Sequence, residues 1–264
     1  MPVISISRGS YHRGRDVAHA VAEMLRYECI SRDSLLENSD IYDTPEIRLL
    51  PNVKHAAQVL EHFSFGRERY VNYMSSSVLR FLKKDNHVYH GLAGQFFVSD
   101  VSHVIKIRII ADLGERVAAE AKRSGLDPDR VRDHLTADDE ERRKWAKLLY
   151  GIDISDPQNY DMVLNISTMS VQDAAALIAQ AASFPCYQAT AESIHRIENL
   201  ALQSEVKAAL FDYPQAKVIA EDGLVHIHVK APADQEEAVR QRIETVLEAI
   251  PEVKKREVTI AHYY

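Results

Sequence analysis

Residues 3–25 read VISISRGSYHRGRDVAHAVAEML, and this stretch decides the fold of the first half of the chain. Val3, Ile4 and Ile6 form a short apolar run that is typical of a strand. A turn follows, with the pattern G-x-x-x-x-G-R-D between Gly9 and Asp16, and an amphipathic helix begins beyond it. The stretch therefore predicts a strand, a glycine turn and a helix in direct succession.

The turn has the glycine spacing of a phosphate-binding P-loop, G-x-x-x-x-G-K-[ST]. Arg15 occupies the position of the lysine, and Asp16 occupies that of the hydroxyl residue. Backbone N–H groups at a glycine turn and a helix N-terminus favour phosphate, and arginine suits bidentate phosphate contacts. A surface turn with solvated arginines is the alternative. The predicted nucleotide-binding residues are Gly9, Ser10, Tyr11, His12, Arg13, Gly14, Arg15 and Asp16, and Asp16 is the predicted Mg²⁺ ligand.

Length and composition indicate a globular protein with two domains. The chain has 264 residues, against roughly 150 for an average domain. It is 46% hydrophobic and 27% charged, with a net charge of −7, which argues against non-specific nucleic-acid binding. The start of the sequence has no signal-peptide pattern, and no apolar run reaches the roughly 20 residues of a membrane span. We therefore expect a cytoplasmic protein.

Strands alternate with helices along the first part of the chain, which indicates an α/β fold with a mostly parallel sheet flanked by helices. The predicted strands lie at the start of 27–38 and within 86–94, 103–111 and 160–167, and the predicted helices lie within 52–84, 112–125 and 170–183. Beyond residue 183 the order becomes helix, strand, strand, helix, strand, which predicts a small α+β domain. The predicted domains are residues 1–183 and 184–264.

Residues 126–151 are highly charged, with both signs mixed. A helical lid carrying arginines would close over a transferring phosphoryl group and neutralise its charge. A solvated helical face with pairs such as Glu140–Lys144 is the alternative. The basic residues of this segment and of the helix before it are Arg116, Arg130, Arg132, Arg142, Arg143, Lys144 and Lys147.

The order of these motifs resembles the cytidylate kinase-like family, part of the P-loop nucleoside monophosphate kinases. Members commonly read SR-x-x-GSGGRE at the phosphate turn. The residues of this chain that fit are Ser7, Arg8, Gly14, Arg15 and Asp16, followed by the D-x-x-R pair of the lid, Asp139 and Arg142. The bulkier Tyr11, His12 and Arg13 replace the small residues of the loop. Leu92 stands where the family usually has the arginine of a G-R-G motif.

This resemblance implies a nucleotide kinase that uses ATP and Mg²⁺ to phosphorylate a nucleoside monophosphate. It assigns Arg15, Arg142 and Arg143 to catalysis, and Arg32 and Asp33 to the acceptor. A nucleotide-sensing protein that binds without transferring phosphate is the alternative, motivated by Leu92 and the bulky turn. A scaffold that binds no nucleotide is the third possibility.

The C-terminal domain resembles a BON domain through EDGLVHIHV (221–229) and the final EVTI (257–260). The resemblance implies a binding module without catalytic residues. A dimerisation or packing module is the alternative, so a homo-oligomer or a protein partner is expected through this domain.

Cys29 and Cys186 show no metal-ligand spacing and are expected to be reduced core thiols. His87, His90 and His103 flank predicted strands and are expected to be hydrogen-bonded structural residues.

Overall fold

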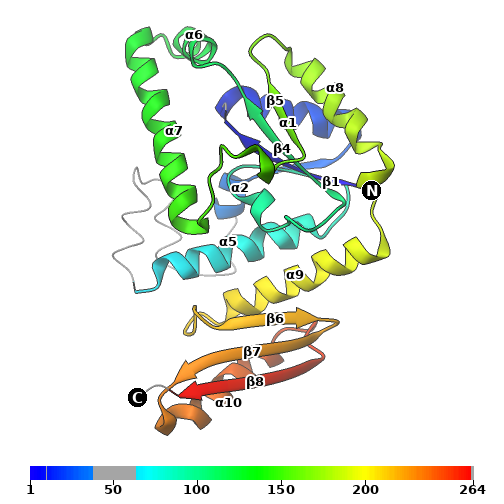
Figure 1. Ribbon diagram of the computed structural model, residues 1–264, viewed down its shortest axis with the longest axis vertical. Coiled ribbons are helices and arrows are strands. Elements are labelled where there is room, and N and C mark those ends of the chain that lie inside the picture. Colours follow the sequence, from blue (N-terminus) through cyan, green and yellow to red (C-terminus); the bar gives the residue numbers. More distant parts are fainter. Residues whose placement is uncertain (10, 38–63, 263–264) are drawn as a thin grey trace. The chain divides into compact units, whose positions relative to one another are not determined.

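Figure 1 shows the computed structural model, which describes residues 1–9, 11–37 and 64–262. The chain forms two compact units. The first comprises Met1–Asn38 and Lys84–Thr190, and the second comprises Ser39–Lys83 and Ala191–Tyr264. Neither unit is one continuous stretch of the sequence, because the internal segment Ser39–Lys83 belongs to the same unit as the C-terminal region. The division at residues 183 and 184 into two functional domains stays a prediction.

A five-stranded sheet forms the centre of the first unit. Its strand order is β2-β3-β1-β4-β5, and every neighbouring pair is parallel. In the middle strand, Ile4 pairs with Val88 on one side and with Ile105 on the other. The predicted α/β fold with a mostly parallel sheet is confirmed. The strands are β1 (Val3–Arg8), β2 (Glu28–Ser31), β3 (His87–His90), β4 (Val104–Ile110) and β5 (Met162–Asn165).

One face of this sheet is covered by α1 (Tyr11–Leu25) and α8 (Val171–Ala182) (Figure 1). Ile4 and Ile6 of β1 and Ile178 of α8 are fully buried in the core there. Burying each such side chain contributes about 1.5–3 kcal/mol. The apolar face of α1 packs in the same core. This packing keeps α1 on the sheet, with its first residues next to the end of β1.

The other helices of the first unit begin and end at clear signals. Asp112 and Asp127 cap α6 and α7, because each carboxylate accepts hydrogen bonds from backbone N–H groups of the first helical turn. Gly125 and Gly151 end these helices, both at a φ of 70°, where glycine carries no steric penalty. The elements are α2 (Arg32–Glu37), η2 (Gly94–Phe96), α6 (Leu113–Ser124), α7 (Pro128–Tyr150), η3 (Pro157–Asn159) and η4 (Pro185–Tyr187).

The strand order creates a switch point at the centre of the sheet. The connection after β1 leads towards β2, whereas the connection after β4 leads to β5 on the other side. Ligands of open parallel sheets bind outside the carboxyl ends of the strands at such a point. The loop from Arg8 into α1 lies at this position, so the fold places the predicted phosphate turn at the favoured binding edge.

The second unit contains a three-stranded sheet of order β6-β7-β8, in which β6 and β7 are antiparallel and β7 and β8 are parallel. Asp222 and Gly223 join β6 to β7 with φ values of 53° and 82°, as a tight hairpin requires. Val225 and Ile227 of β7 and Ile243 of α10 are buried in its core. The elements are α5 (Gly66–Leu82), α9 (Ala191–Ala209), β6 (Lys217–Glu221), β7 (Leu224–Ala231), η5 (Ala233–Gln235), α10 (Glu236–Glu248) and β8 (Lys255–His262).

The predicted helix, strand, strand, helix, strand order of the C-terminal region is confirmed by α9 to β8. The predicted helical region 52–84 is represented by α5, and its earlier part lies outside the described residues. α5 packs on α9, where Arg80 and Glu205 form an ion pair of 3.1 Å. Among the described residues, none of the helices is both long and apolar enough to cross a membrane.

Candidate functional site

The turn after β1 is held tightly against β4. The backbone N–H of Gly9 donates to the carbonyl oxygen of Ile109 over 2.7 Å. A Cβ atom at Gly9 would lie 2.9 Å from that same oxygen, so a larger residue would push the turn away from the sheet. This contact gives a physical reason for glycine at position 9, and the role of Gly9 in nucleotide binding stays a prediction. Ser10 lies outside the described residues.

Helix α1 begins earlier than the motif predicts. Its first residue is Tyr11, so Gly14, Arg15 and Asp16 lie within the helix instead of in an open glycine loop. The physical reason is in the sequence, because residues 11–13 contain no glycine, and Tyr, His and Arg have far better helix propensities than glycine. Gly14 still matters for packing, since a Cβ there would lie 3.1 Å from Cγ of Arg8.

The three arginines of the predicted turn have different surroundings. Arg13 donates from Nη2 to the carbonyl oxygen of Met169 over 2.9 Å, which ties α1 to the loop before α8. Arg8 is 8% exposed and lies 3.9 Å from a carboxylate oxygen of Asp33. Arg15 is half exposed. Of the three, Arg15 has the side chain most accessible to a ligand.

The predicted acceptor residues, Arg32 and Asp33, begin α2 directly after β2. Gly91, which follows β3, brings its backbone close to this point, since a Cβ there would lie 2.8 Å from Cβ of Arg32. Together with the Arg8–Asp33 contact of 3.9 Å, this places the predicted acceptor residues beside the carboxyl ends of β1 and β3. The fold therefore brings residues from positions 8, 32 and 91 to one edge.

Tyr160, which was not predicted as a functional residue from the sequence, lies at the centre of a buried polar network. The hydroxyl of Tyr160 accepts hydrogen bonds of 3.2 Å from Arg108 and of 3.2 Å from Gln95. It donates to the carbonyl oxygen of Ile154 over 2.9 Å and lies 3.3 Å from Oγ of Ser7. These residues come from four separate segments, so no local spacing could have revealed the network.

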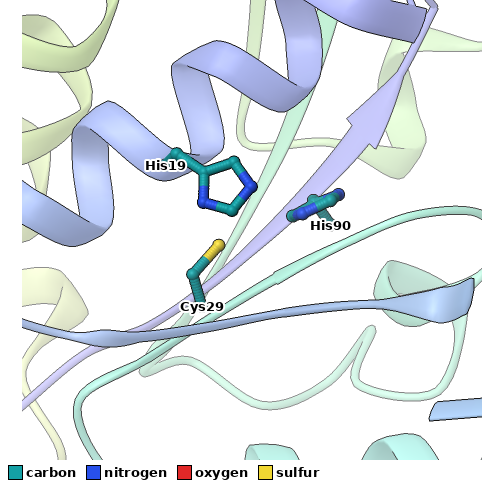
Figure 2. A group of neighbouring side chains, drawn as sticks. All are labelled: His19, Cys29 and His90. Carbon is teal, nitrogen blue, oxygen red and sulfur yellow. The ribbon is translucent and has the colours of Figure 1, made fainter. Parts of the chain in front are cut away.

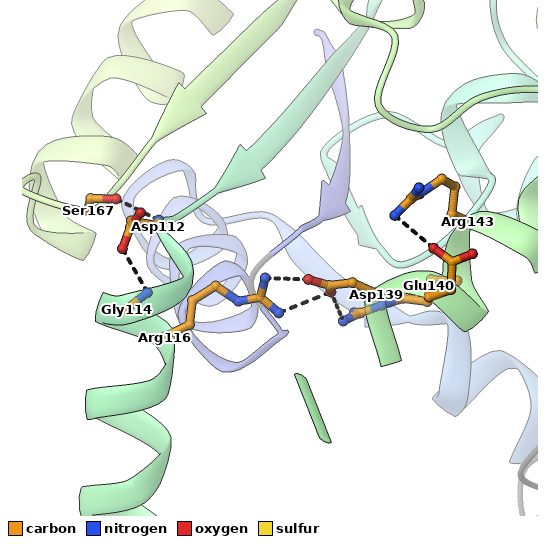
Figure 3. A network of polar contacts seen from close by, with 8 residues as sticks. Asp112, Gly114, Arg116, Asp139, Glu140, Arg143 and Ser167 are labelled. Atoms are coloured by element: carbon orange, nitrogen blue, oxygen red, sulfur yellow. Dashed lines mark hydrogen bonds and ion pairs between the residues drawn. The ribbon is translucent and has the colours of Figure 1, made fainter. Parts of the chain in front are cut away.

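The charged segment forms one continuous helix, α7, which contacts α6 in a helical hairpin (Figure 1). Arg116 of α6 donates to both carboxylate oxygens of Asp139, at 2.5 and 3.0 Å (Figure 3). Arg142 donates to the same carboxylate over 2.9 Å. Arg143 forms a separate ion pair of 2.9 Å with Glu140. Both predicted lid arginines are therefore engaged by carboxylates of their own helix.

The carboxyl edges of β4 and β5 are joined by a further contact. The backbone N–H of Asp112 donates to Oγ of Ser167 over 2.7 Å (Figure 3). Ser167 Oγ in turn donates to Oδ1 of Asn165 over 2.7 Å. This link fixes the start of α6 against the end of β5. The base of the α6–α7 hairpin is thus linked by hydrogen bonds to the edge at which the β1 turn lies.

The cysteines and histidines differ from the predictions in their burial and in their hydrogen bonds. Cys29 is half-buried, but Cys186 is exposed, so the prediction of a core thiol is wrong for Cys186. His87 has the expected hydrogen-bond partners, including a carboxylate oxygen of Glu28 at 3.1 Å. His90 and His103 are also buried, yet within the described part of the chain Nδ1 of each has no hydrogen-bond partner.

A family model described as the cytidylate kinase-like family matches residues 3–168, which is more than half of the chain. The chain belongs to the cytidylate kinase-like family. The match covers the β1 turn, the strands β1 to β5 and the α6–α7 hairpin. Membership supports a kinase-type protein that uses nucleotides and metal ions in general, with the substrate left open.

One solved structure gives the fold further support. An uncharacterized protein from Eubacterium ventriosum ATCC 27560 is similar with a TM-score of 0.53 and 17% identity, over 69% of this chain and 97% of that one. A dephospho-CoA kinase from Campylobacter jejuni aligns over the same shares of the two chains, with 15% identity and a TM-score of 0.34, which is too low to establish a common fold. No curated protein matches the sequence.

Proposed function

We propose that this protein is a kinase that transfers the γ-phosphoryl group of ATP to a nucleoside monophosphate of the CMP type or a related acceptor. The observation that supports this most directly is the start of α1 at the carboxyl end of β1, the central strand at the switch point of the sheet. The positive end of a helix dipole favours phosphate at that place. Phosphoryl transfer depends mainly on positioning and charge neutralisation, which such an edge can supply.

In this proposal Gly9, Gly14 and Arg15 bind the phosphates of ATP. The acceptor would contact Arg32, with Asp33 beside it, and the transferring phosphoryl group would be neutralised by Arg142 or Arg143. Arg142 is already oriented by Asp139, so a ligand would have to draw this arginine from its carboxylate. Phosphate oxygens are strong enough acceptors for arginine to make that exchange favourable.

Asp16 is the proposed Mg²⁺ residue. Its carboxylate is about half exposed and lies 3.9 Å from Nε of Arg15. Mg²⁺ in kinases is usually held by one or two carboxylates together with substrate phosphates and water. A single exposed carboxylate fits this donor set when nucleotide is bound. Asp16 would then orient the ion, which supplies charge neutralisation to the phosphates.

For the C-terminal region we propose a BON-like binding module within residues 184–264, appended to a kinase domain of residues 1–183. The hairpin through Asp222 and Gly223 and the confirmed order of elements support this. The module would mediate a homo-oligomer or bind a protein partner. We further propose a cytoplasmic location, where ATP and nucleoside monophosphates are available.

A nucleotide-sensing protein that does not transfer phosphate is the second candidate. Two observations favour it: helix α1 closes the loop that would otherwise cradle phosphate, and Leu92 replaces an arginine at the acceptor side. Such a protein would bind nucleotide at the same edge. It would differ from a kinase only in having no turnover.

A coupled assay with ATP, Mg²⁺ and a panel of pyrimidine and purine monophosphates tests the proposal. We expect ADP formation that requires one class of monophosphate. Calorimetry with ATP and Mg²⁺ is performed in parallel, and Arg15→Ala is expected to weaken ATP binding by about tenfold or more, because it removes a charge-assisted contact. Arg123→Ala, which removes an exposed arginine of α6 paired with Glu120, is the matched control and should leave binding unchanged.

The outcomes separate the candidates. Turnover with a monophosphate supports the kinase, and ATP binding without turnover for any acceptor supports the sensor. If neither ATP nor any monophosphate binds to the folded protein, both candidates are wrong and the scaffold is favoured.

A further inference from the structure

Three side chains with metal-binding atoms meet beneath α1. They are His19 of α1, Cys29 of β2 and His90 of β3, and their ligand atoms lie within 4.8 Å of one another. Figure 2 shows the sulfur of Cys29 and the ring of His90 directed towards the ring of His19. Within the described part of the chain, these three side chains form the one group of potential metal ligands that lie close enough together to hold an ion.

The imidazole ring of His90 is buried with one ring nitrogen that no described residue pairs by a hydrogen bond. The residue is 2% exposed, and its Nδ1 atom has no hydrogen-bond partner among the described residues. Buried polar atoms are nearly always paired, and an unpaired one costs about 1–3 kcal/mol. Its ring lies 5.4 Å from that of His19 in an edge-on arrangement. An ion between the two rings would give the buried imidazole a partner.

The protonation state of the imidazole suits a metal ligand. Burial, together with the nearby charges of Arg8, His19 and Arg15, lowers the pKa of His90 to about 3. The ring is therefore neutral at physiological pH, as coordination requires. Burial also raises the pKa of Cys29 to about 11, so this residue is a thiol and a poor nucleophile in the absence of a metal.

We propose that His19, Cys29 and His90 form a site for a Zn²⁺-type transition-metal ion, with the fourth position open to water or an exogenous ligand. Two imidazoles and one thiolate match the ligands that Zn²⁺ prefers, and three protein ligands with an open position are typical of non-structural zinc sites. Its nitrogen and sulfur donors differ in chemistry from the hard oxygen donor proposed for Mg²⁺ at Asp16.

The geometry requires a modest contraction. Zn–N bonds of about 2.0–2.1 Å and Zn–S bonds of about 2.3 Å place tetrahedral ligand atoms about 3.3–3.6 Å apart. All three ligand atoms lie within 4.8 Å of one another, so side-chain movements of no more than about 1.5 Å bring them to the tetrahedral spacing. His19 is exposed on the surface of α1 and has the rotamer freedom to close on the ion, whereas Cys29 and His90 are fixed by the sheet.

Neighbouring arginines affect the affinity of the proposed site for a cation. Arg8 and Arg15 act on His90, and Arg8 acts on Cys29. These cations oppose a divalent ion, but metal binding converts the thiol to a thiolate and so adds a compensating negative charge. The thiolate is therefore the only proposed ligand that offsets the two arginines, and loss of the sulfur should weaken binding strongly.

The test uses the full-length, tag-free protein after removal of metal with a chelator. Zn²⁺ is measured by equilibrium dialysis, and Co²⁺ is added as a spectroscopic substitute. We expect one ion per chain and a thiolate-to-cobalt charge-transfer absorption in the near ultraviolet. Cys29→Ser should abolish that absorption and weaken Zn²⁺ binding by at least about tenfold, and His19→Gln should weaken binding similarly.

Matched controls keep the result interpretable. Cys186→Ser removes the exposed cysteine, and His103→Gln removes a buried histidine outside the cluster; both should bind Zn²⁺ like the unmodified protein. Because His19 is exposed, His19→Gln is expected to fold even if a His90 variant does not, and circular dichroism verifies this. Absence of binding, or binding that is unchanged in Cys29→Ser and His19→Gln, would overturn the proposal.

Discussion

At the scale of single residues, close contacts around the carboxyl ends of the strands leave little room for change. Gly94 is the tightest position, because a Cβ atom there would lie 2.4 Å from Cε1 of Tyr89 and 2.8 Å from Oγ of Ser5. Tyr89 is fully buried and donates through its hydroxyl to the carbonyl oxygen of Leu92. A larger residue at position 94 would have to displace this ring, and with it the segment where Leu92 replaces the expected arginine.

Gly94→Ala is therefore expected to lower the free energy of unfolding by about 1–3 kcal/mol, the usual cost of overpacking. Urea denaturation followed by circular dichroism measures the change. Gly114→Ala is the comparison variant, because a Cβ at this exposed glycine would meet no buried ring and would lie 3.0 Å from Oδ1 of Asp112, the cap of α6. Equal stability of the Gly94→Ala variant and the unmodified protein would show that Tyr89 can move without cost.

At the scale of elements, the α6–α7 hairpin depends on one carboxylate. Asp139 binds Arg116 in a bidentate manner and Arg142 through one oxygen. Arg116 is 9% exposed, so its charge has little access to water. The hairpin is thus held by a partly buried ion pair between its helices, in addition to apolar packing.

Asp139→Asn should destabilise the protein by about 1–3 kcal/mol, because it leaves the Arg116 guanidinium without its counter-charge. Glu140→Gln is the matched control on the same helix. Its partner Arg143 is 57% exposed, and exposed ion pairs contribute about 0–1 kcal/mol. Urea unfolding of the two variants tests the difference, and an equal loss in both would contradict the role given to Asp139.

At the scale of the whole molecule, buried histidines make stability depend on pH. His103 is 2% exposed, and none of the described residues forms a hydrogen bond with its Nδ1. Burial lowers its pKa, with Asp85 opposing the shift. The unfolded chain takes up a proton at this residue near pH 6.5, whereas the folded protein does so only at lower pH. Between about pH 6.5 and the lower pKa of the folded state, the unfolded state binds more protons at His103 than the folded state does. The free energy of unfolding therefore falls as the pH falls through this range.

His103→Gln removes this titrating group. We expect its free energy of unfolding to decline less steeply than that of the unmodified protein as the pH falls from about 6.5, with a difference of at most about 1.4 kcal/mol per pH unit. Urea titrations at several pH values between 7 and 4 provide the measurement. Parallel curves for the two proteins would show that His103 does not contribute.

The sequence by itself determined the elements and their order. The apolar alternation of β1 and β4, the helical spacing of α8 and its Ser170 cap, and the glycine between β6 and β7 are local signals. Such signals predict strands and helices because each depends on neighbouring residues in the chain. The order of motifs from Ser7 to Arg142 likewise indicated the family. The spacing of Gly9 and Gly14 did not reveal that residues 11–13 are already helical.

Only the tertiary structure decided which distant residues meet. The parallel order β2-β3-β1-β4-β5 brings Cys29 and His90 into contact range beneath His19, and it surrounds the Tyr160 hydroxyl with Ser7, Arg108 and Gln95. These residues are separated by long and unequal stretches of chain, so no periodicity connects them. Their convergence follows from strand order and register, which depend on burial of the whole sheet.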